Sequence, residues 1–469
     1  MSKITVDFSK TLGEIKPVNG VNNGPLTGRF CRDRRAEFKR AGIPFSRLHD
    51  TEGSMGSGEF VNIHCIFKNF DADVNDPASY NFAATDIYIK AILDAGTKVF
   101  YRLGETIENR EKTLRSHTFA PKDPYKWAQI CEHIIRHYNE GWADGFHMGI
   151  EYWEIWNEPE GAPGTSPNWG GTEREFFELY RITANHLKKC FGEKIKVGGY
   201  ASTGFYDVNS IGAHAIAPGS LINETTEGIG LAESFPVSYM YRFFDYITSP
   251  ETYAPIDFFS WHLYGTSPER CKFEIDLSRE LLEHYGMADR VESILDEWNW
   301  MECWAPKEGK IRKSMTGAAF VSAMHTVMQK SFLSKSMYYD AEPGRISFCG
   351  LFNEYDSSIL EKPYFSFLAF NELRKLGAEA QTDGDGDGIY ALAATSGSSH
   401  AVVITSYDRE CTDAELDISG VDAPSRVSVS LLDEEHSLDE IMSFTASSLS
   451  SIKLPLGKNS VALVKIEKI

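Results

Sequence analysis

Eight short apolar segments alternate with longer amphipathic segments over the first three quarters of the chain. The apolar segments have the length of strands and cover residues 16–21, 43–48, 98–103, 151–156, 195–199, 257–262, 290–296 and 335–339. The segments between them repeat apolar residues at helical spacing, at 32–41, 83–95, 124–138, 172–191, 238–248, 277–285 and 314–331. Alternating strands and helices predict parallel βαβ units, and eight strands close a (β/α)8 TIM barrel of the α/β class.

Helix boundary signals support this division. Residues 172–175, Thr-Glu-Arg-Glu, have the pattern of a capping box that starts a helix. Glycines follow several of the helical segments, where a left-handed residue is favoured: Gly42, Gly96, Gly192 and Gly286.

The pattern changes after about residue 370. An Asp-Gly run at 383–388 is followed by β-rich segments at 389–395, 401–406, 415–418, 425–432, 451–454 and 460–467, without a long helical period. We therefore predict a barrel over residues 14–370 and an accessory all-β sandwich over 371–469. The first strand-like residues, 1–13, are expected to join the sandwich.

Composition excludes several partners. A formal net charge of −20 argues against nucleic acid and anionic membranes, which attract basic surfaces. The chain has no uninterrupted apolar stretch of about 18 residues, so no membrane span is expected. The eight cysteines are scattered singly and the first residues lack an apolar leader. Both features favour a cytoplasmic protein with reduced thiols.

The motifs that would indicate a cofactor or metal are incomplete. A calcium loop starting at Asp383 would need a glutamate at its twelfth position, where Ala394 stands. His133 and His137 lie four residues apart on a predicted helix, but no third zinc ligand accompanies them. The chain also lacks the nucleophile-elbow, P-loop and dinucleotide motifs. We expect no cofactor and no metal.

Two predicted strands end in a glutamate beside tryptophan and asparagine. Residues 153–159 read Trp-Glu-Ile-Trp-Asn-Glu-Pro, and residues 294–299 read Ile-Leu-Asp-Glu-Trp-Asn. Glu158 and Glu297 thus stand where a buried strand gives way to a loop. Glycoside hydrolysis requires such a pair, one carboxyl to protonate the leaving oxygen and one to attack or to assist water.

Other strand ends carry polar and aromatic residues as well. In a TIM barrel the carboxyl ends of the strands meet at one rim, where active sites form. The sequence therefore predicts one site that gathers His49, Asn157, Glu158, His262, Tyr264, Glu297, Trp300 and Tyr339.

These segments resemble the retaining (β/α)8 glycosidases, and within that clan they resemble glycoside hydrolase family 39, which includes β-xylosidases and α-L-iduronidases. The resemblance rests on residues 45–49, 153–159, 260–264 and 296–299. The terminal β domain also fits the family layout. The family more often has a small residue at Asp50, threonine at Asp296 and asparagine at Glu160, so these three residues are expected to add negative charge around the site.

The resemblance implies roles for the rim residues. Glu158 would be the general acid/base and Glu297 the nucleophile, and Asn157 would bind the sugar 2-hydroxyl. Tyr264 would donate to Glu297, while His49 and His262 bind ring hydroxyls. Candidate stacking residues for the sugar are Trp298, Trp300 and Trp304; for Trp298 a place in the core is an equal alternative. Tyr339 is a further candidate for binding the substrate.

The expected function is thus a retaining, exo-acting, β-xylosidase-like glycosidase with an oligosaccharide or glycoside substrate, and the resemblance favours a homo-oligomer. Within the clan, an arabinofuranosidase-like or endo-acting enzyme is the alternative. Outside it, two further alternatives are a carbohydrate-binding barrel without catalysis and a metal-assisted hydrolase, for which His49, Asp50 and His262 would be the ligands.

Overall fold

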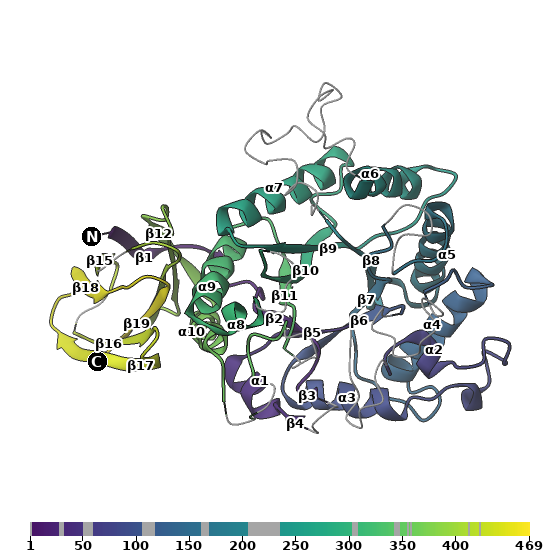
Figure 1. The fold of residues 1–469 in the computed structure, drawn as a ribbon, viewed down its shortest axis with the longest axis horizontal. Coiled ribbons are helices and arrows are strands. Elements are labelled where there is room, and N and C mark those ends of the chain that lie inside the picture. The colour runs from purple at the N-terminus through teal and green to yellow at the C-terminus, as the bar shows by residue number, and fades with distance from the viewer. Residues whose placement is uncertain are drawn as a thin grey trace.

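A closed barrel of eight parallel strands dominates the protein (Figure 1). The computed structural model describes residues 2–27, 32–49, 60–105, 118–160, 168–204, 235–302, 308–341, 348–353, 356, 359–410, 413–421 and 424–469. The barrel strands are, in spatial order, β10 (Glu292–Trp300), β11 (Lys335–Tyr338), β2 (Gly20–Asn22), β5 (Phe45–Leu48), β6 (Lys98–Leu103), β7 (Tyr152–Ile155), β8 (Lys196–Ser202) and β9 (Phe258–Gly265). The predicted (β/α)8 barrel is confirmed, although its first strand is only three residues long.

Helices surround the barrel (Figure 1). They are α1 (Arg35–Ala41), α3 (Ala83–Asp94), α4 (Pro124–Glu140), α5 (Glu173–Phe191), α6 (Phe235–Thr248), α7 (Pro268–His284), α8 (Glu308–Lys313), α9 (Met315–Gln329) and α10 (Lys362–Leu376). Shorter elements are α2 (Ile63–Ile66), η1 (Pro77–Ser79), η2 (Gly192–Lys194), β3 (Leu26–Thr27) and β4 (Arg32–Asp33). Among the described residues, none of the helices is both long and apolar enough to cross a bilayer.

Local signals explain most helix boundaries. The predicted capping box is present at the start of α5, where the Thr172 side chain and Glu175 bond each other's backbone. The prediction placed the start of α7 at residue 277, which was wrong by nine residues. Ser267 caps that helix and Pro268 occupies its first turn, a preferred position for proline. Helix α10 was not predicted.

The barrel interior is built in layers, because alternate residues of each strand face inward. The amino-terminal end is closed by one apolar residue from each of six strands, namely Phe45, Phe100, Tyr152, Phe258, Ile294 and Met337. Two residues further along four of these strands stand ionisable side chains that are fully buried, Arg47, Arg102, Glu154 and Asp296. The interior thus changes from apolar to ionic toward the carboxyl ends of the strands.

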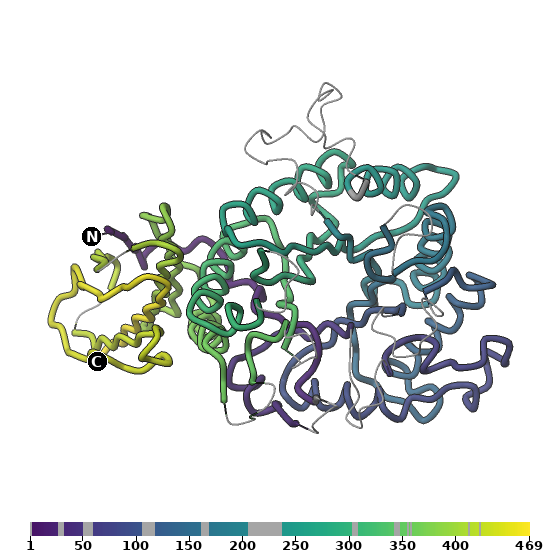
Figure 2. Tube along the Cα trace, viewed as in Figure 1, coloured from purple at the N-terminus to yellow at the C-terminus, as the bar shows by residue number. Residues whose placement is uncertain are grey.

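A second, mostly β domain lies beside the barrel and contains the yellow end of the chain (Figure 2). Its nine strands are, in spatial order, β17 (Ser437–Ala446), β16 (Ser425–Leu432), β19 (Ser460–Lys468), β14 (Ser399–Ser406), β13 (Ile389–Thr395), β12 (Ala378–Asp383), β1 (Ser2–Glu14), β15 (Asp413–Ser419) and β18 (Ser451–Pro455). Strand β1 pairs antiparallel with β12 and parallel with β15, so the amino-terminal strand belongs to this sheet. The boundaries 14–370 and 371–469 stay a prediction.

Strand β13 shows how the two domains are joined. Its alternate residues Ile389, Ala391 and Ala393 belong to the core of the β domain. The residues between them, Tyr390, Leu392 and Ala394, belong to the core of the barrel, where β13 contacts α9 and α10. Both faces of this strand are therefore buried, which explains its continuous apolar sequence.

Candidate active site

The two predicted glutamates meet at the carboxyl end of the barrel. Glu158 follows β7, Glu297 lies in β10, and one carboxylate oxygen from each lies within 4.8 Å of the other and of a ring nitrogen of His262. The side chain of Glu158 is 22% exposed and that of Glu297 is 7% exposed. Strands far apart in the sequence thus place two carboxyl groups face to face.

The backbone around Glu158 is unusual. Trp156 has φ 72° and Glu158 has φ 44°, values in the left-handed region that side chains other than glycine seldom adopt. The Glu158 amide donates to the Ala201 carbonyl at 3.0 Å, and the Trp156 indole donates to the Asn168 carbonyl at 2.8 Å. Such conformations persist where surrounding contacts hold them, and they concentrate at functional sites.

Arg47 of β5 connects the site to the barrel interior. Its guanidinium donates to Oε1 of Glu297 at 2.9 Å, to Oδ1 of Asn157 at 2.7 Å and to Oε2 of Glu154 at 2.7 Å. It also lies 2.8 Å from Oδ2 of Asp296. Burial alone would lower the pKa of Arg47, but the surrounding carboxylates outweigh burial and raise it. The guanidinium is therefore permanently charged and contacts five side chains, the fifth through a 3.1 Å hydrogen bond to Oδ1 of Asn22.

The pKa values of two carboxyl groups below Glu297, those of Asp296 and Glu154, are shifted in opposite directions. Burial raises the pKa of Asp296 well above its usual range. Burial also acts to raise the pKa of Glu154, but attraction to Arg47 and a hydrogen bond from Asp296 lower it overall. Asp296 thus carries the proton and Glu154 the negative charge.

Glu160 is also buried, and burial raises its pKa to about 8. Its Oε1 accepts hydrogen bonds from the Ser202 hydroxyl at 2.5 Å and from the Thr203 amide at 3.1 Å. The sequence predicted added negative charge at Asp296 and Glu160. That prediction was wrong at neutral pH, because burial favours the protonated form of both. Asp50 lies outside the described residues.

Glu297 has further partners at the rim. The Tyr264 hydroxyl donates to its Oε2 at 2.8 Å, and Nε2 of His49 lies 3.5 Å from its Oε1. Burial and the nearby guanidinium of Arg47 hold the pKa of His49 well below its usual range, so this imidazole is neutral. The Glu297 carboxylate is thus oriented by a guanidinium and a phenol.

His262 lies between the two glutamates and is fully buried. Its Nδ1 is 2.5 Å from Oε1 of Glu158 and 3.5 Å from Oε2 of Glu297. The Asn168 side-chain amide donates to the other oxygen of Glu158 at 3.3 Å. The imidazole therefore contacts the carboxyl groups of both glutamates.

The aromatic residues divide into two groups. The ring of Tyr339 lies 6.2 Å from that of His49 and 6.5 Å from that of Tyr264, which places it in the site. Trp300 is buried, and its indole donates to the Tyr407 hydroxyl of the β domain at 3.2 Å. Trp298 is a core residue that contacts rings of α9 and β11. Trp304 lies outside the described residues.

The structure thus brings seven of the eight predicted site residues together, and it places Trp300 against the β domain. The sequence analysis assigned no role to the buried charged residues Arg47, Arg102 and Glu154. Arg102, for example, donates to the His49 carbonyl at 3.3 Å and to Asn62 Oδ1 at 3.0 Å. A signal was present, since Arg47, Arg102 and Glu154 each interrupt an apolar strand two residues after an inward-facing ring.

Comparison with known proteins agrees with this geometry. Residues 3–437 match the family described as Glycosyl hydrolases family 39. A β-xylosidase of Caldicellulosiruptor saccharolyticus is 28% identical over 212 residues, which are 43% of this chain and 40% of that protein. The matched stretch therefore spans less than half of the relative's length.

Solved structures share the fold. A glucosidase from Croceicoccus marinus superposes with a TM-score of 0.78 at 21% identity, over 100% of this chain and 99% of that chain. A monomeric β-xylosidase from Caulobacter crescentus gives a TM-score of 0.70 at 16% identity, over 100% of both chains. The family match extends over most of the sequence, and the chain belongs to the glycosyl hydrolases of family 39.

Proposed function

We propose that this protein is a retaining glycoside hydrolase that works by double displacement with Glu158 and Glu297. The observation that carries the proposal is the approach of the two carboxylates, whose oxygens lie within 4.8 Å. Retaining enzymes hold these groups about 5–5.5 Å apart, whereas inverting enzymes need about 6.5–9.5 Å to admit a water molecule between carboxyl and sugar.

Glu297 is the nucleophile in this proposal. A nucleophilic carboxylate must be ionised, and hydrogen bonds from the Arg47 guanidinium and the Tyr264 hydroxyl stabilise that form. Its oxygen attacks the anomeric carbon, and the bond from that carbon to the leaving oxygen breaks. The product of this step is a glycosyl ester on Glu297.

Glu158 is the acid and then the base. It is the more exposed of the two carboxyls, and it protonates the leaving oxygen in the first step. In the second step it takes a proton from the water whose oxygen attacks the anomeric carbon, and the ester bond to Glu297 breaks. Contact with Nδ1 of His262 orients the carboxyl for both transfers.

Asn157 and the rim residues bind the sugar. Because Oδ1 of Asn157 accepts from Arg47, the amide NH2 group is the part that donates to the substrate, and we assign it to the 2-hydroxyl. His49 and Tyr339, which neighbour each other at the rim, are assigned to other ring hydroxyls. His262 acts as a positioning residue through Glu158.

A β-xyloside is the favoured substrate, with exo action. The partial match to a protein named β-xylosidase supports this choice. The fold also resembles that of a protein named glucosidase, so a β-glucoside is included among the test substrates. An arabinofuranosidase-like or endo-acting enzyme of the clan is the alternative.

The test is hydrolysis of aryl β-xyloside, α-arabinoside, β-glucoside, β-galactoside and α-iduronide by the protein and by Glu158→Gln and Glu297→Gln. Glu283→Gln is the matched control, because Glu283 is a half-exposed residue of α7 that forms a surface ion pair with Arg279. The configuration of the first sugar released is followed by proton NMR.

We expect one glycoside to be cleaved with retention and Glu297→Gln to abolish its turnover. Glu158→Gln should lose most activity on glycosides with poor leaving groups and less on those with good ones, since good leaving groups need little protonation. Activity that survives Glu297→Gln, or a first product of inverted configuration, would overturn the double-displacement proposal.

A further inference from the structure

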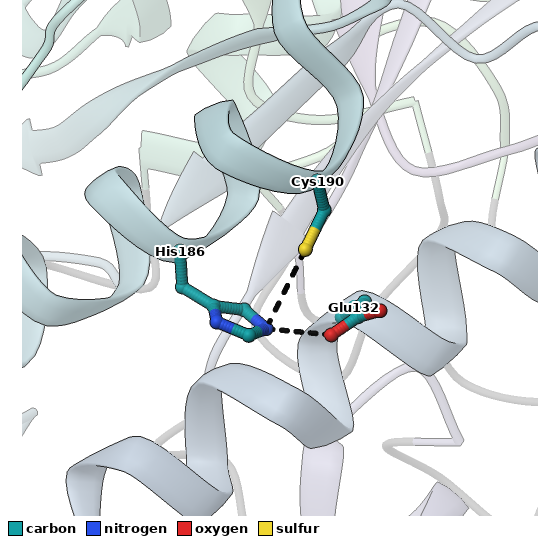
Figure 3. A group of neighbouring side chains, drawn as sticks. All are labelled: Glu132, His186 and Cys190. Carbon is teal, nitrogen blue, oxygen red and sulfur yellow. Dashed lines mark hydrogen bonds and ion pairs between the residues drawn. The ribbon is translucent and has the colours of Figure 1, made fainter.

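Three side chains that commonly ligate metals converge on the outer layer of the barrel, away from the glutamate pair. Glu132 lies on α4, and His186 and Cys190 lie one turn apart on α5 (Figure 3). Nε2 of His186 is 2.6 Å from Oε2 of Glu132 and 3.8 Å from Sγ of Cys190. All three ligand atoms lie within 4.8 Å of one another, and all three residues are partly buried.

We propose that Glu132, His186 and Cys190 form a binding site for a divalent metal ion of the zinc type. Zinc takes imidazole nitrogen at about 2.0–2.1 Å, thiolate sulfur at about 2.3 Å and carboxylate oxygen at about 2.0–2.2 Å. In a tetrahedron with these bond lengths, nitrogen and sulfur lie roughly 3.5 Å apart, close to the separation in the structure. The site needs only a small opening of the bond between His186 and Glu132.

The spacing of the ligands also fits. Residues four apart on a helix project from the same side, so His186 and Cys190 face α4 together, as Figure 3 shows. Glu132 completes the set from the neighbouring helix. Glu132 precedes His186 by 54 residues in the sequence. This separation explains why no local sequence motif indicates the site.

Neighbouring charges leave room for a cation. Arg136 donates to Oε1 of Glu132 at 2.7 Å, which leaves Oε2 directed at His186. Arg136 is also paired with Glu140. One arginine, two glutamates and a Cys190 thiolate carry a net charge of −2, which a divalent ion neutralises.

Metal binding displaces protons in a defined way. On binding, the thiol releases its proton to solvent and the sulfur–metal bond forms. The His186 nitrogen exchanges its contact with Glu132 for the metal.

The proposed site would join two helices. Helices α4 and α5 contact each other and flank β7, the strand that ends next to Glu158. A metal bridge between them would raise the resistance of this part of the barrel to heat, without entering the reaction.

The test uses reduced, chelator-treated full-length protein titrated with zinc in competition with a chromophoric chelator, and then with cobalt. We expect one equivalent of metal to bind, a cobalt spectrum with a thiolate charge-transfer band, and a rise in the melting temperature. Cys190→Ser and His186→Gln should weaken binding at least tenfold and remove the band. Cys65→Ser and His133→Gln should not, because Cys65 and His133 lie outside the cluster.

The experiment must also distinguish this site from a second group of possible metal ligands. Ligand atoms of Glu158, His262 and Glu297 also lie within 4.8 Å of one another. Zinc bound there would inhibit hydrolysis, and its affinity would fall in Glu297→Gln. One-equivalent binding that Cys190→Ser and His186→Gln leave unchanged would overturn the proposal, as would absence of the thiolate band. Failure of the glycosidase assays would leave this result untouched.

Discussion

Nη1 of Arg47 lies 2.9 Å from Oε1 of Glu297, so a guanidinium buried inside the barrel donates directly to the carboxylate assigned as nucleophile. The same guanidinium orients Asn157 through Nη2. Arg47 therefore orients both Glu297 and Asn157, and a substitution of Arg47 should affect the function of both residues.

Replacement of Arg47 by lysine should reduce kcat/KM by at least about 100-fold, which corresponds to about 2.7 kcal/mol of transition-state stabilisation. Lysine keeps the charge but not the planar set of donors that reaches several partners at once. Steady-state kinetics on the preferred aryl glycoside measures the loss. A lysine variant within threefold of the parent protein would contradict this view of the network.

Removal of the Tyr264 hydroxyl should slow formation of the glycosyl ester. Tyr264→Phe loses the 2.8 Å bond to Glu297, and we expect kcat to fall by about 10- to 100-fold, or about 1.4–2.7 kcal/mol. Rapid-quench kinetics separates this step from release. Tyr285→Phe is the matched control, because its hydroxyl donates to Asp245, away from the site, and it should retain full activity.

Glu160 should make stability fall as pH rises. Its pKa is raised to about 8 in the folded protein, above the usual value of 4.5, so between these values the folded state binds more protons than the unfolded state. Stability is therefore lost at up to about 1.4 kcal/mol per pH unit from about pH 4.5 to about pH 8. In Glu160→Gln the free energy of unfolding in urea should depend less steeply on pH over this window. Equal slopes for variant and parent would refute the assignment.

Two neighbouring carboxyls should respond differently to amide substitution. Asp296 is protonated, so Asp296→Asn preserves its neutral state and should cost less than about 1.5 kcal/mol of stability. Glu154→Gln removes an ionised partner from buried Arg47 and should cost about 3–5 kcal/mol. Urea unfolding of both variants measures the difference, and the reverse order would show that Glu154 carries the proton.

The contact between the domains should contribute to stability. The Tyr407 hydroxyl accepts from the Trp300 indole at 3.2 Å and donates to the Thr266 carbonyl at 2.6 Å. Tyr407→Phe leaves the buried indole nitrogen without this acceptor, so we expect a loss of about 1–3 kcal/mol. Thermal unfolding measures it, while the KM for an aryl glycoside should be unchanged if Trp300 serves the domain contact. A raised KM would instead support a role for Trp300 in binding the sugar.

Sequence periodicity was sufficient to predict the barrel, because all eight strands are short apolar runs between amphipathic helices. Helix α10 was missed because its apolar residues are spread around the helix, as expected for an element buried between the barrel and the β domain. The rim residues Glu158 and Glu297 were recognisable because each follows a short apolar run and stands beside tryptophan or asparagine.

The ionic layer beneath them was not predicted in detail. Arg47 meets Glu154 and Glu297 across 107 and 250 residues of sequence, and no local pattern gives such pairings. The protonation of Asp296 follows from burial between these groups, which only the folded arrangement creates.

The position of β1 has a consequence for how the chain reaches its final form during synthesis. Residues 2–7 pair with residues 414–419 of β15, and residues 5–14 pair with β12. Strand β1 is therefore made long before either neighbour, because β12 begins at residue 378 and β15 at residue 413. The barrel strands, from Gly20 to Tyr338, are made within that interval, so the barrel can begin to fold before β1 has a strand to pair with.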